Sequence, residues 1–471
     1  MAYSVYLETY GCSANKNDAE IIKGLLTSKG FNLVESESIA DIIIINTCIV
    51  KEPTIKKIEQ RIKNLSRTGK KLIISGCMPE VFSKKLSKIA PKASLISTHH
   101  LKEIVNVLKK MFKGEKSILL GKPDGKDEIK LCLPKISQNK SIGIIQICQG
   151  CINSCSYCLV KKVKGPLFSY PEDKILKEIE SNLQSGAKEI WLTSQDNACY
   201  GYDGLVSPDF SDKNQPISCS VNLDFEGSSN NFQTITKNQT NTDTTRTNLP
   251  RLIKKISSLN HKFFLRIGMM NPSSIQPILN NLIQAYKSDK VFKFLHIPIQ
   301  SGSDKILKLM NRKYDTKEVL HIIDVFKKEF PEIVIAIDII VGFPNEDDED
   351  FQKTLDIIEN IRPDVLNHSR FWSMKGTEAS KMKETVSKSE LKKREVELMN
   401  LHAKIALENK QKFIGNEYKV LVDDKGFKDT WLARNKNYQL IILRSQENLQ
   451  GKFLKVKIKE AKAHYLIGEI I

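Results

Sequence analysis

Three cysteines are grouped in the segment Gln149-Gly150-Cys151-Ile-Asn-Ser-Cys155-Ser-Tyr157-Cys158, with the spacing C-x3-C-x2-C. Three thiolates on one short loop can hold three irons of a [4Fe–4S] cluster and leave the fourth iron open to a small molecule, whereas ferredoxin-type clusters use four cysteines. An open iron indicates catalysis rather than electron transfer alone. The spacing therefore predicts a catalytic iron–sulfur site.

Cys148 allows a second interpretation, because Cys148-x2-Cys151 and Cys155-x2-Cys158 could be paired zinc knuckles. Structural zinc sites normally separate their two pairs by a dozen or more residues, so we favour the iron–sulfur interpretation. Cys148 also ends an apolar run, which is typical of a buried strand cysteine. Whether it contacts the cluster stays open.

Three further cysteines each follow a predicted strand, in Tyr10-Gly11-Cys12, Asn46-Thr47-Cys48 and Ser75-Gly76-Cys77. The carboxyl ends of parallel strands share one edge of a sheet, so these thiols are expected to converge. Repetition of this position favours a second three-cysteine cluster over three unrelated buried cysteines. The remaining cysteines, Cys132, Cys148, Cys199 and Cys219, are expected to be bystanders.

The elements that position these cysteines form two series of alternating strands and helices. In the first 110 or so residues, the β-branched runs predict strands at 4–9, 41–46, 71–75 and 93–97, with helices at 17–28, 54–65 and 79–89 between them. The second series predicts strands at 142–147, 189–193, 263–267, 293–298, 334–340 and 365–371. Parallel strands with connecting helices indicate an α/β barrel, in which chemistry lies at the carboxyl ends of the strands.

Two other segments differ from this pattern. Residues 203–246 are rich in Ser, Asn, Thr, Gln and Asp, and we expect a disordered polar insertion there. A helical segment at 387–412 leads to residues 413–471, where alternating runs at 418–422 and 453–458 predict a small antiparallel β-barrel with a basic charge.

Composition limits the class of protein. The 471 residues carry a formal net charge of +18 and are 40% apolar, which excludes disordered, fibrous and disulfide-rich secreted proteins and favours a polyanionic partner. No secretory leader is visible, and the apolar runs are far shorter than the roughly 20 residues of a membrane span. We expect a cytoplasmic protein with no membrane association, where clustered cysteines more often bind metal than form disulfides.

Together, the motifs resemble those of the radical S-adenosylmethionine (SAM) methylthiotransferases that modify tRNA, most of all the archaeal and eukaryotic type that acts on N6-threonylcarbamoyladenosine. The resemblance covers nearly the whole chain outside the polar insertion. The matching segments are Glu8 to Asn15, Asn46 to Lys51, Ser75 to Pro79, Gly150 to Cys158, Glu189 to Asp196, Leu265 to Pro272, His296 to Ser303 and Asp338 to Glu346.

The resemblance implies an α/β protein of three domains. These are an N-terminal methylthiotransferase domain at 1–112, a radical SAM partial (β/α)6 barrel at 137–373, and a small antiparallel RNA-binding β-barrel (TRAM) at 413–471. It implies an auxiliary [4Fe–4S] cluster on Cys12, Cys48 and Cys77 and a second cluster on Cys151, Cys155 and Cys158. SAM bound to the open iron of the second cluster would be cleaved to a radical that takes hydrogen from C2 of the adenine.

The family pattern also suggests further site residues. We expect cofactor contacts from Tyr157, Gln195, Asp196, Gln300, Gly342 and Pro344. Capping of a helix by Ser194 or Asp196 is an equally weighted alternative at that strand end. Substrate contacts are expected from Arg266 and Arg370, with Arg370 directed at the threonyl carboxylate. In the C-terminal segment, the residue types themselves predict RNA contacts: Arg434 and Lys436 offer charge to phosphates, and the Tyr438 ring can stack on a base. The partner is tRNA, and the sulfur donor and electron donor are unknown.

Three alternatives remain. Related enzymes methylthiolate an aspartate of a ribosomal protein or a prenyladenosine of tRNA. A non-catalytic RNA-binding protein with structural zinc is the third. The Cys-Ser-Ala-Asn motif that begins at Cys12, the Ser-Gln-Asp motif that ends at Asp196 and the basic C-terminal segment favour tRNA over a protein substrate. Both classes carry this last domain, so the choice rests on the detailed resemblance.

Overall fold

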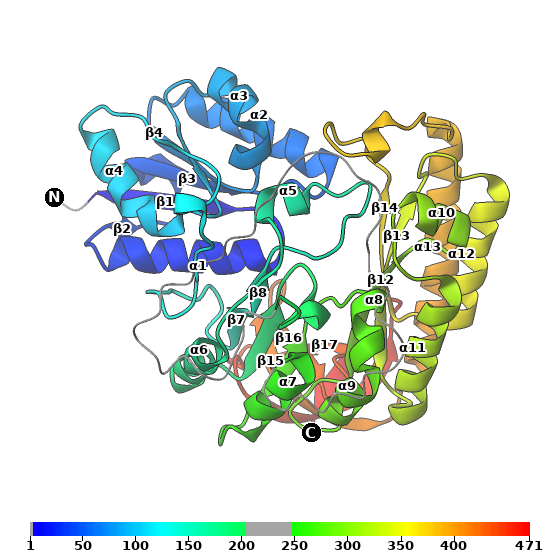
Figure 1. Ribbon diagram of the computed structural model, residues 1–471. Coiled ribbons are helices and arrows are strands. Elements are labelled where there is room, and N and C mark those ends of the chain that lie inside the picture. The colour runs from blue at the N-terminus through cyan, green and yellow to red at the C-terminus, as the bar shows by residue number, and fades with distance from the viewer. Residues whose placement is uncertain (1–2, 204–246) are drawn as a thin grey trace.

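The computed structural model describes residues 3–203 and 247–471, which form two α/β units and a small barrel (Figure 1). The predicted disordered insertion, apart from Asp203, and the predicted bystander Cys219 lie outside these residues. Within the described part of the chain, no helix is both long and apolar enough to cross a membrane.

The N-terminal unit is a parallel sheet in the order β2-β1-β3-β4-β5-β6 with helices on both faces. Its strands are β1 (Ser4–Thr9), β2 (Asn32–Leu33), β3 (Ile42–Thr47), β4 (Lys71–Gly76), β5 (Ser94–Ser97) and β6 (Ile118–Leu119). Its helices are α1 (Ser13–Thr27), α2 (Glu52–Ser66), α3 (Met78–Ile89) and α4 (Ile104–Phe112). Every residue of β3 is buried, as expected for a strand covered on both faces, because α2 and α3 pack on one face and α1 and α4 on the other.

The second unit is an open barrel of six parallel strands made of two three-stranded sheets, β11-β10-β7 and β12-β13-β14. These strands are β7 (Ile142–Gln146), β10 (Glu189–Thr193), β11 (Phe264–Ile267), β12 (Phe294–Gln300), β13 (Val334–Val341) and β14 (Val365–Arg370). A single bridge between Leu265 and Val291 joins the two halves. The predicted partial (β/α)6 barrel is therefore confirmed.

Helices surround this barrel on its outer side (Figure 1). They are α6 (Glu172–Gln184), α7 (Leu249–Ser258), α8 (Pro272–Ile275), α9 (Leu279–Tyr286), α10 (Asp304–Leu309), α11 (Thr316–Glu329) and α12 (Asp348–Ile361). Alternate strand residues, such as Ile190, Leu192, Leu295 and Ile297, form one large core with them. The intervening residues, such as Trp191 and His296, therefore point to the barrel interior.

A short segment joins the two α/β units. After β7, the chain passes through β8 (Cys148–Gln149), the three-cysteine loop, α5 (Val160–Lys164) and β9 (Phe168–Ser169). Leu159 and Val163 are buried in the same core as Ile58 of α2 and Leu86 of α3. Helix α5 thus belongs by sequence to the second unit and by packing to the first.

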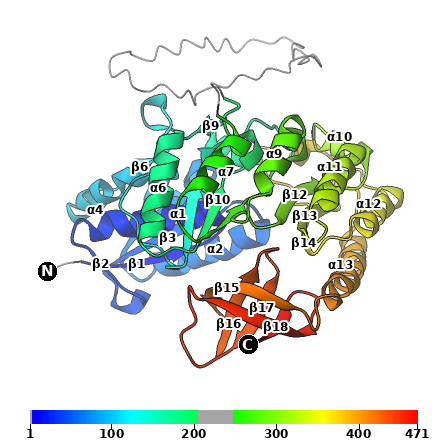
Figure 2. The ribbon, with the colours of Figure 1, turned by 90° about the horizontal axis from the view of Figure 1, so that it is seen from below.

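The long helix α13 (Lys388–Gln411) then leads to a closed barrel with strand order β15-β16-β17-β19-β18 (Figure 2). Its strands are β15 (Glu417–Lys425), β16 (Thr430–Asn435), β17 (Leu440–Arg444), β18 (Phe453–Ala461) and β19 (Leu466–Ile470). The expected small C-terminal barrel is confirmed, although β17 and β19 pair in parallel and the other strands in antiparallel fashion.

Candidate functional site

The loop between β8 and α5 directs amide hydrogens at its cysteine sulfurs. The Asn153 amide donates to Cys151 Sγ at 3.4 Å, and the Val160 amide donates to Cys158 Sγ at 3.3 Å. Burial raises the pKa of the Cys151 thiol to about 11, and the Asn153 amide opposes that rise. Because N–H groups aimed at sulfur favour the thiolate, this loop suits sulfur ligands of iron.

Arg312 supplies the donor for the third sulfur of this loop. Its Nη1 lies 3.1 Å from Cys155 Sγ, while Nη2 donates to the Pro298 carbonyl and Nε to the Tyr314 hydroxyl. The guanidinium is therefore held in one orientation by β12 and by the residues after α10. Sequence reasoning missed this residue, and the only available signal was its place in the basic segment Asn311-Arg312-Lys313-Tyr314.

Gln195 holds the residue that precedes the three cysteines. Its side-chain Oε1 accepts a hydrogen bond from the Gly150 amide at 2.8 Å, which ties the end of β10 to the start of the loop. Gly150 has φ +78°, and a Cβ there would lie 1.9 Å from the Pro166 carbonyl oxygen. Only glycine fits this backbone, so the loop is fixed at its entrance.

The thiols of Cys12, Cys48 and Cys77 lie at the carboxyl edge of the N-terminal sheet, as predicted. The Cys77 amide donates to the Thr47 carbonyl at 3.0 Å, and a Cβ on Gly11 would lie 3.0 Å from Cys48 Sγ. These contacts bring together the three chain segments that follow β1, β3 and β4.

Asn15 braces the same edge from α1. Its Nδ2 donates to the Tyr10 and Thr47 carbonyls at 2.9 and 2.8 Å, and its Oδ1 lies 3.7 Å from Cys77 Sγ. These two hydrogen bonds join the ends of β1 and β3. The buried Asn15 side chain is a second functional candidate that sequence reasoning did not single out.

Positive charge and backbone amides at this edge offset part of the cost of burying ionised sulfur. Burial raises the pKa of the Cys77 thiol to about 12, and the Lys164 ammonium is the main group that opposes the rise. For Cys48, burial also raises the pKa, and the backbone amides of Val50 and Ile49 lower it. The edge therefore offers three converging sulfurs with amide and ammonium groups around them, which suits thiolate ligands.

Cys148, which the zinc interpretation would use, has a different environment. It is fully buried, and its thiol is directed at the Asp196 carbonyl at 3.8 Å. The Cys199 thiol lies 3.0 Å from the same carbonyl. Within residues 3–203 and 247–471, no three His, Cys, Asp or Glu side chains form a site for a single metal ion.

The predicted cofactor residue Asp196 caps a short 3-10 helix at Asn197–Cys199. Its Oδ1 accepts from the Ala198 and Asn271 amides at 3.1 and 3.0 Å, and its Oδ2 accepts from the Ser274 hydroxyl at 2.7 Å. These hydrogen bonds agree with the alternative prediction, in which Asp196 caps a helix and does not bind the cofactor. The neighbouring Ser194 hydroxyl is buried and has no hydrogen-bond partner in the structure, so it is one polar group at this strand end that is free to bind a ligand.

A cavity of about 290 Å³ lies between the N-terminal unit and the barrel. Predicted cofactor residues Tyr157 and Gln300 line it, together with Val50 and Lys51 from the loop after β3. Gln300 has φ +76° where the pairing of β12 with β13 shifts register, so a backbone irregularity directs this residue. The cavity is built by both units and is the candidate substrate site.

Arg370 also lines the cavity, but its guanidinium is already paired. Nε and Nη2 both donate to Glu395 Oε2 on α13, at 2.7 Å for Nε. Within the cavity, Asp338 accepts hydrogen bonds from His296 and Asn367, each at 2.9 Å. The expected contact between Arg370 and a substrate carboxylate stays a prediction, and it requires the Glu395 pair to be shared or broken.

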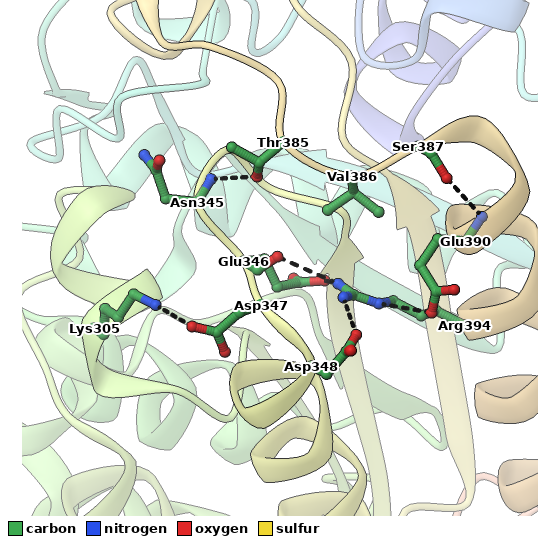
Figure 3. Close-up of a pocket in the computed structure, with 10 residues that line it drawn as sticks. All are labelled: Lys305, Asn345, Glu346, Asp347, Asp348, Thr385, Val386, Ser387, Glu390 and Arg394. Carbon is green, nitrogen blue, oxygen red and sulfur yellow. Dashed lines mark hydrogen bonds and ion pairs between the residues drawn. The ribbon is translucent and has the colours of Figure 1, made fainter.

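The turn after β13 that contains Gly342 and Pro344 is fixed from outside the barrel (Figure 3). The Gly342 amide donates to Glu346 Oε1 at 3.0 Å, and Arg394 Nη1 donates to the same oxygen at 2.7 Å. A Cβ on Gly342 would lie 2.5 Å from Leu391 of α13. The φ of +77° at Gly342 also favours glycine, and a SAM contact of Gly342 and Pro344 stays a prediction.

Two of the predicted substrate residues, Tyr438 and Arg266, are placed elsewhere by the structure. Tyr438 is 9% exposed and packs on Phe292 and Phe294 at 4.8 Å between ring centres. Arg266 lies over the Trp191, Phe294 and Tyr438 rings inside the barrel. The expectation that Tyr438 stacks on nucleic acid is wrong here, because its ring is covered by the contact between the two barrels.

Arg434 belongs to the same contact. Its guanidinium lies 4.5 Å from the Tyr438 ring centre, and its Nε is 3.3 Å from Asp423 Oδ2. Both groups are largely buried, so Arg434 is not presented to RNA. Lys436 is half exposed and paired with Asp289 across the domain contact, at 2.7 Å. Of the predicted substrate residues on the C-terminal barrel, Lys436 alone presents its charge to solvent.

Family models match three consecutive parts of the chain. Residues 4–98 match an uncharacterized protein family, UPF0004, residues 145–358 match the radical SAM superfamily, and residues 411–471 match the TRAM domain. A probable threonylcarbamoyladenosine tRNA methylthiotransferase of Pyrococcus horikoshii is 36% identical over 469 residues, which cover 99% of each chain. The chain belongs to the threonylcarbamoyladenosine tRNA methylthiotransferase family.

This family includes a human relative that is 32% identical over 99% of this chain and 73% of its own. Among solved structures, the radical SAM methyltransferase TsrM of Kitasatospora setae, with cobalamin and a [4Fe–4S] cluster bound, has a TM-score of 0.52 and 11% identity. The match covers 79% of this chain and 72% of TsrM. That similarity shows a shared fold. The cavity is lined by Val50 and Lys51, which follow Cys48, and by Tyr157, which precedes Cys158, so it is the candidate active site of this family member.

Proposed function

We propose that this chain transfers a methylthio group to C2 of N6-threonylcarbamoyladenosine at position 37 of tRNA, next to the anticodon. The product would be 2-methylthio-N6-threonylcarbamoyladenosine. The single observation that carries the proposal is the placement of two three-cysteine sets at the carboxyl edges of two parallel sheets, joined by α5 and with one cavity between the sheets. A reaction that activates a carbon and also delivers sulfur needs both functions beside one substrate.

Cys151, Cys155 and Cys158 would hold one [4Fe–4S] cluster, and Cys12, Cys48 and Cys77 a second. When bound, the first cluster and SAM supply one-electron chemistry that can activate an inert aromatic C–H bond. SAM would lie near the free Ser194 hydroxyl, with the predicted residues Tyr157 and Gln300 on the cavity side.

The chain's own residues orient the reactants. Gln195 and Gly150 fix the entrance of the three-cysteine loop, and Arg312 orients Cys155. Asp338, His296 and Asn367 form a hydrogen-bonded group on the inner face of the barrel, where they can position the base. The N-terminal unit closes the cavity through Val50 and Lys51, and Lys51 Nζ reaches the His368 carbonyl at 3.4 Å.

The test is mass spectrometry of nucleosides from tRNA of a strain that lacks this chain. The proposal requires 2-methylthio-N6-threonylcarbamoyladenosine to disappear and its unthiolated precursor to accumulate, with both restored by the wild-type chain. Unchanged levels would contradict it. A change confined to prenyladenosine nucleosides or to a ribosomal protein would support the sibling activities instead.

Metal analysis tests the cofactor part of the proposal separately. Anaerobically reconstituted chain is expected to bind about eight irons with matching sulfide, the content of two [4Fe–4S] clusters. Tightly bound zinc without iron would favour the non-catalytic RNA-binding alternative. We place the reaction in the cytoplasm, with tRNA as partner and with sulfur and electron donors still to be identified.

A further inference from the structure

Four polar side chains from four parts of the chain form a buried cluster beside Cys12, Cys48 and Cys77. They are Asp18 of α1, Thr98 after β5, Lys130 of the connector and Lys164 at the end of α5. Their exposed fractions are 0%, 0%, 1% and 2%. Two lysines and one carboxylate are therefore enclosed in a place from which water is nearly absent.

Asp18 is shared unequally by the two lysines. Lys130 Nζ lies 2.9 Å from Asp18 Oδ1 and 2.8 Å from the Thr98 hydroxyl oxygen. Lys164 Nζ lies 3.7 Å from Asp18 Oδ2, beyond hydrogen-bond distance, and 2.7 Å from the Thr98 hydroxyl oxygen. Asp18 thus bonds directly to Lys130 and forms a longer ion pair with Lys164, so one carboxylate faces two ammonium groups.

The other titratable groups around the cluster do not balance Lys164. Glu128 faces Lys130 and lies 3.9 Å from Lys102. His99 is neutral near pH 7, because burial lowers its pKa to about 4. Val163, next to Lys164, shares a buried core with Cys48 and Cys77, and after Asp18 the acidic groups that act most on Lys164 are the thiols of Cys77, Cys12 and Cys48. One carboxylate balances only one of the two buried ammonium groups, and an unbalanced buried ammonium costs several kcal/mol, so thiolates at these positions would supply the missing negative charge.

We propose that Lys164 is the positioning residue that supplies the counter-charge for the auxiliary iron–sulfur cluster on Cys12, Cys48 and Cys77. The inference rests on the two-cluster form of the proposed function. The inference goes further, because it assigns the radical SAM unit a role at the auxiliary site: Lys164 ends the helix that follows Cys151, Cys155 and Cys158. The auxiliary site is therefore incomplete without a residue located six positions after Cys158.

The physical consequence is a shift in reduction potential. Three thiolates give the occupied site a negative charge, and reduction by one electron makes it more negative. A fixed cation at short range in a medium of low dielectric constant stabilises the reduced state more than the oxidised one. Lys164 therefore raises the midpoint potential of the auxiliary cluster.

The experiment uses the full chain with Cys151→Ala, Cys155→Ala and Cys158→Ala, so that of the two three-cysteine sets only the auxiliary one remains. The anaerobically reconstituted protein is titrated with reductant while the electron paramagnetic resonance signal is followed. Lys164→Met is expected to lower the midpoint potential, and Lys164→Arg to keep it within error. Lys130→Met is the matched control, since it removes an equally buried cation that bonds directly to Asp18, and a smaller shift is expected.

An unchanged midpoint in Lys164→Met would overturn the proposal. If Lys164→Met binds no iron, retention of about four irons by Lys164→Arg still supports it. Loss of iron in both variants with an unchanged circular dichroism spectrum of the apo chain overturns it. A parent chain that binds no iron overturns the two-cluster part of the proposed function as well, whereas nucleoside analysis of the wild type tests the methylthiolation itself.

Discussion

Arg312 Nη1 lies 3.1 Å from Cys155 Sγ, and the rest of the guanidinium is bound to the Pro298 carbonyl and the Tyr314 hydroxyl. A side chain from the segment after α10 therefore controls the middle cysteine of a loop that lies more than 150 residues earlier in the chain.

Arg312→Met should reduce iron loading of the radical SAM loop and SAM cleavage. The buried charge-assisted bond to sulfur is lost, at a cost of about 2 kcal/mol. Cleavage of SAM with dithionite, measured by chromatography, checks the loss. Arg312→Lys keeps the charge but not the planar fork and should recover only part of the activity. Full SAM cleavage by Arg312→Met would contradict this role.

The two cysteine sets should have separable functions. Alanine at Cys12, Cys48 or Cys77 should leave SAM cleavage intact and abolish methylthiolation of tRNA, because only the sulfur-delivering site is lost. Alanine at Cys151, Cys155 or Cys158 should abolish both reactions. Parallel assays of SAM cleavage and thiolated nucleoside make the comparison, and equal loss of SAM cleavage in both sets would refute the division.

Gly150→Ala should disrupt the three-cysteine loop. The new Cβ would lie 1.9 Å from the Pro166 carbonyl oxygen, in addition to about 1 kcal/mol for a side chain at positive φ. We expect iron content per chain to fall by more than half. Gly69→Ala is the control, because Gly69 has φ +73° with no atom within 4 Å of a Cβ. It should retain full iron content, and equal loss in both variants would rule out the steric explanation.

In the C-terminal barrel, substitution of a buried residue should change the stability of the fold, whereas substitution of an exposed one should change tRNA binding. Tyr438→Ala removes a ring packed on Phe292 and Phe294 and should lower the free energy of unfolding by about 3 kcal/mol, measured in urea. Lys436→Ala should leave stability unchanged and weaken tRNA binding, with a smaller dependence on salt. Normal stability of Tyr438→Ala with weakened tRNA binding would restore the original stacking hypothesis.

Acid should destabilise the fold partly through His402. Burial lowers its pKa to about 4, so between pH 6.5 and 4 the unfolded chain binds a proton that the native chain does not. Stability conferred by the neutral imidazole is present above pH 6.5 and is lost as the pH falls towards 4. His402→Leu should reduce the pH dependence of the urea midpoint in this window. His321→Leu, at an exposed position of α11, should leave that dependence unchanged.

Much of the architecture was predictable from hydrophobic periodicity. The strands β4, β7, β10 and β13 begin at the predicted residues, since buried parallel strands are continuous runs of Ile, Val and Leu. The edge strands β2 and β6 were missed because each has two residues and a weak pattern. Convergence of Cys12, Cys48 and Cys77 followed from topology alone, because the carboxyl ends of parallel strands meet.

Contacts between segments that are distant in the sequence could not be predicted in this way. Arg312 and Cys155, or Lys164 and Asp18, lie far apart in the sequence, and no local periodicity pairs them. Tyr438 lies among basic residues in the sequence, which is typical of an RNA contact, but in the fold it is a buried core residue. Charge and ring type do not reveal which surface a neighbouring domain covers.

The packing of α5 affects the order in which the chain can mature on the ribosome. Leu159 and Val163 complete the core that α2 and α3 build on one face of the first sheet, and Lys164 reaches the thiols at its edge. The first unit therefore cannot reach its final packing until residues beyond 164 have left the exit tunnel. By then the second cysteine loop has also been synthesised, so insertion of the proposed cluster at the N-terminal edge would follow the synthesis of all six proposed ligands.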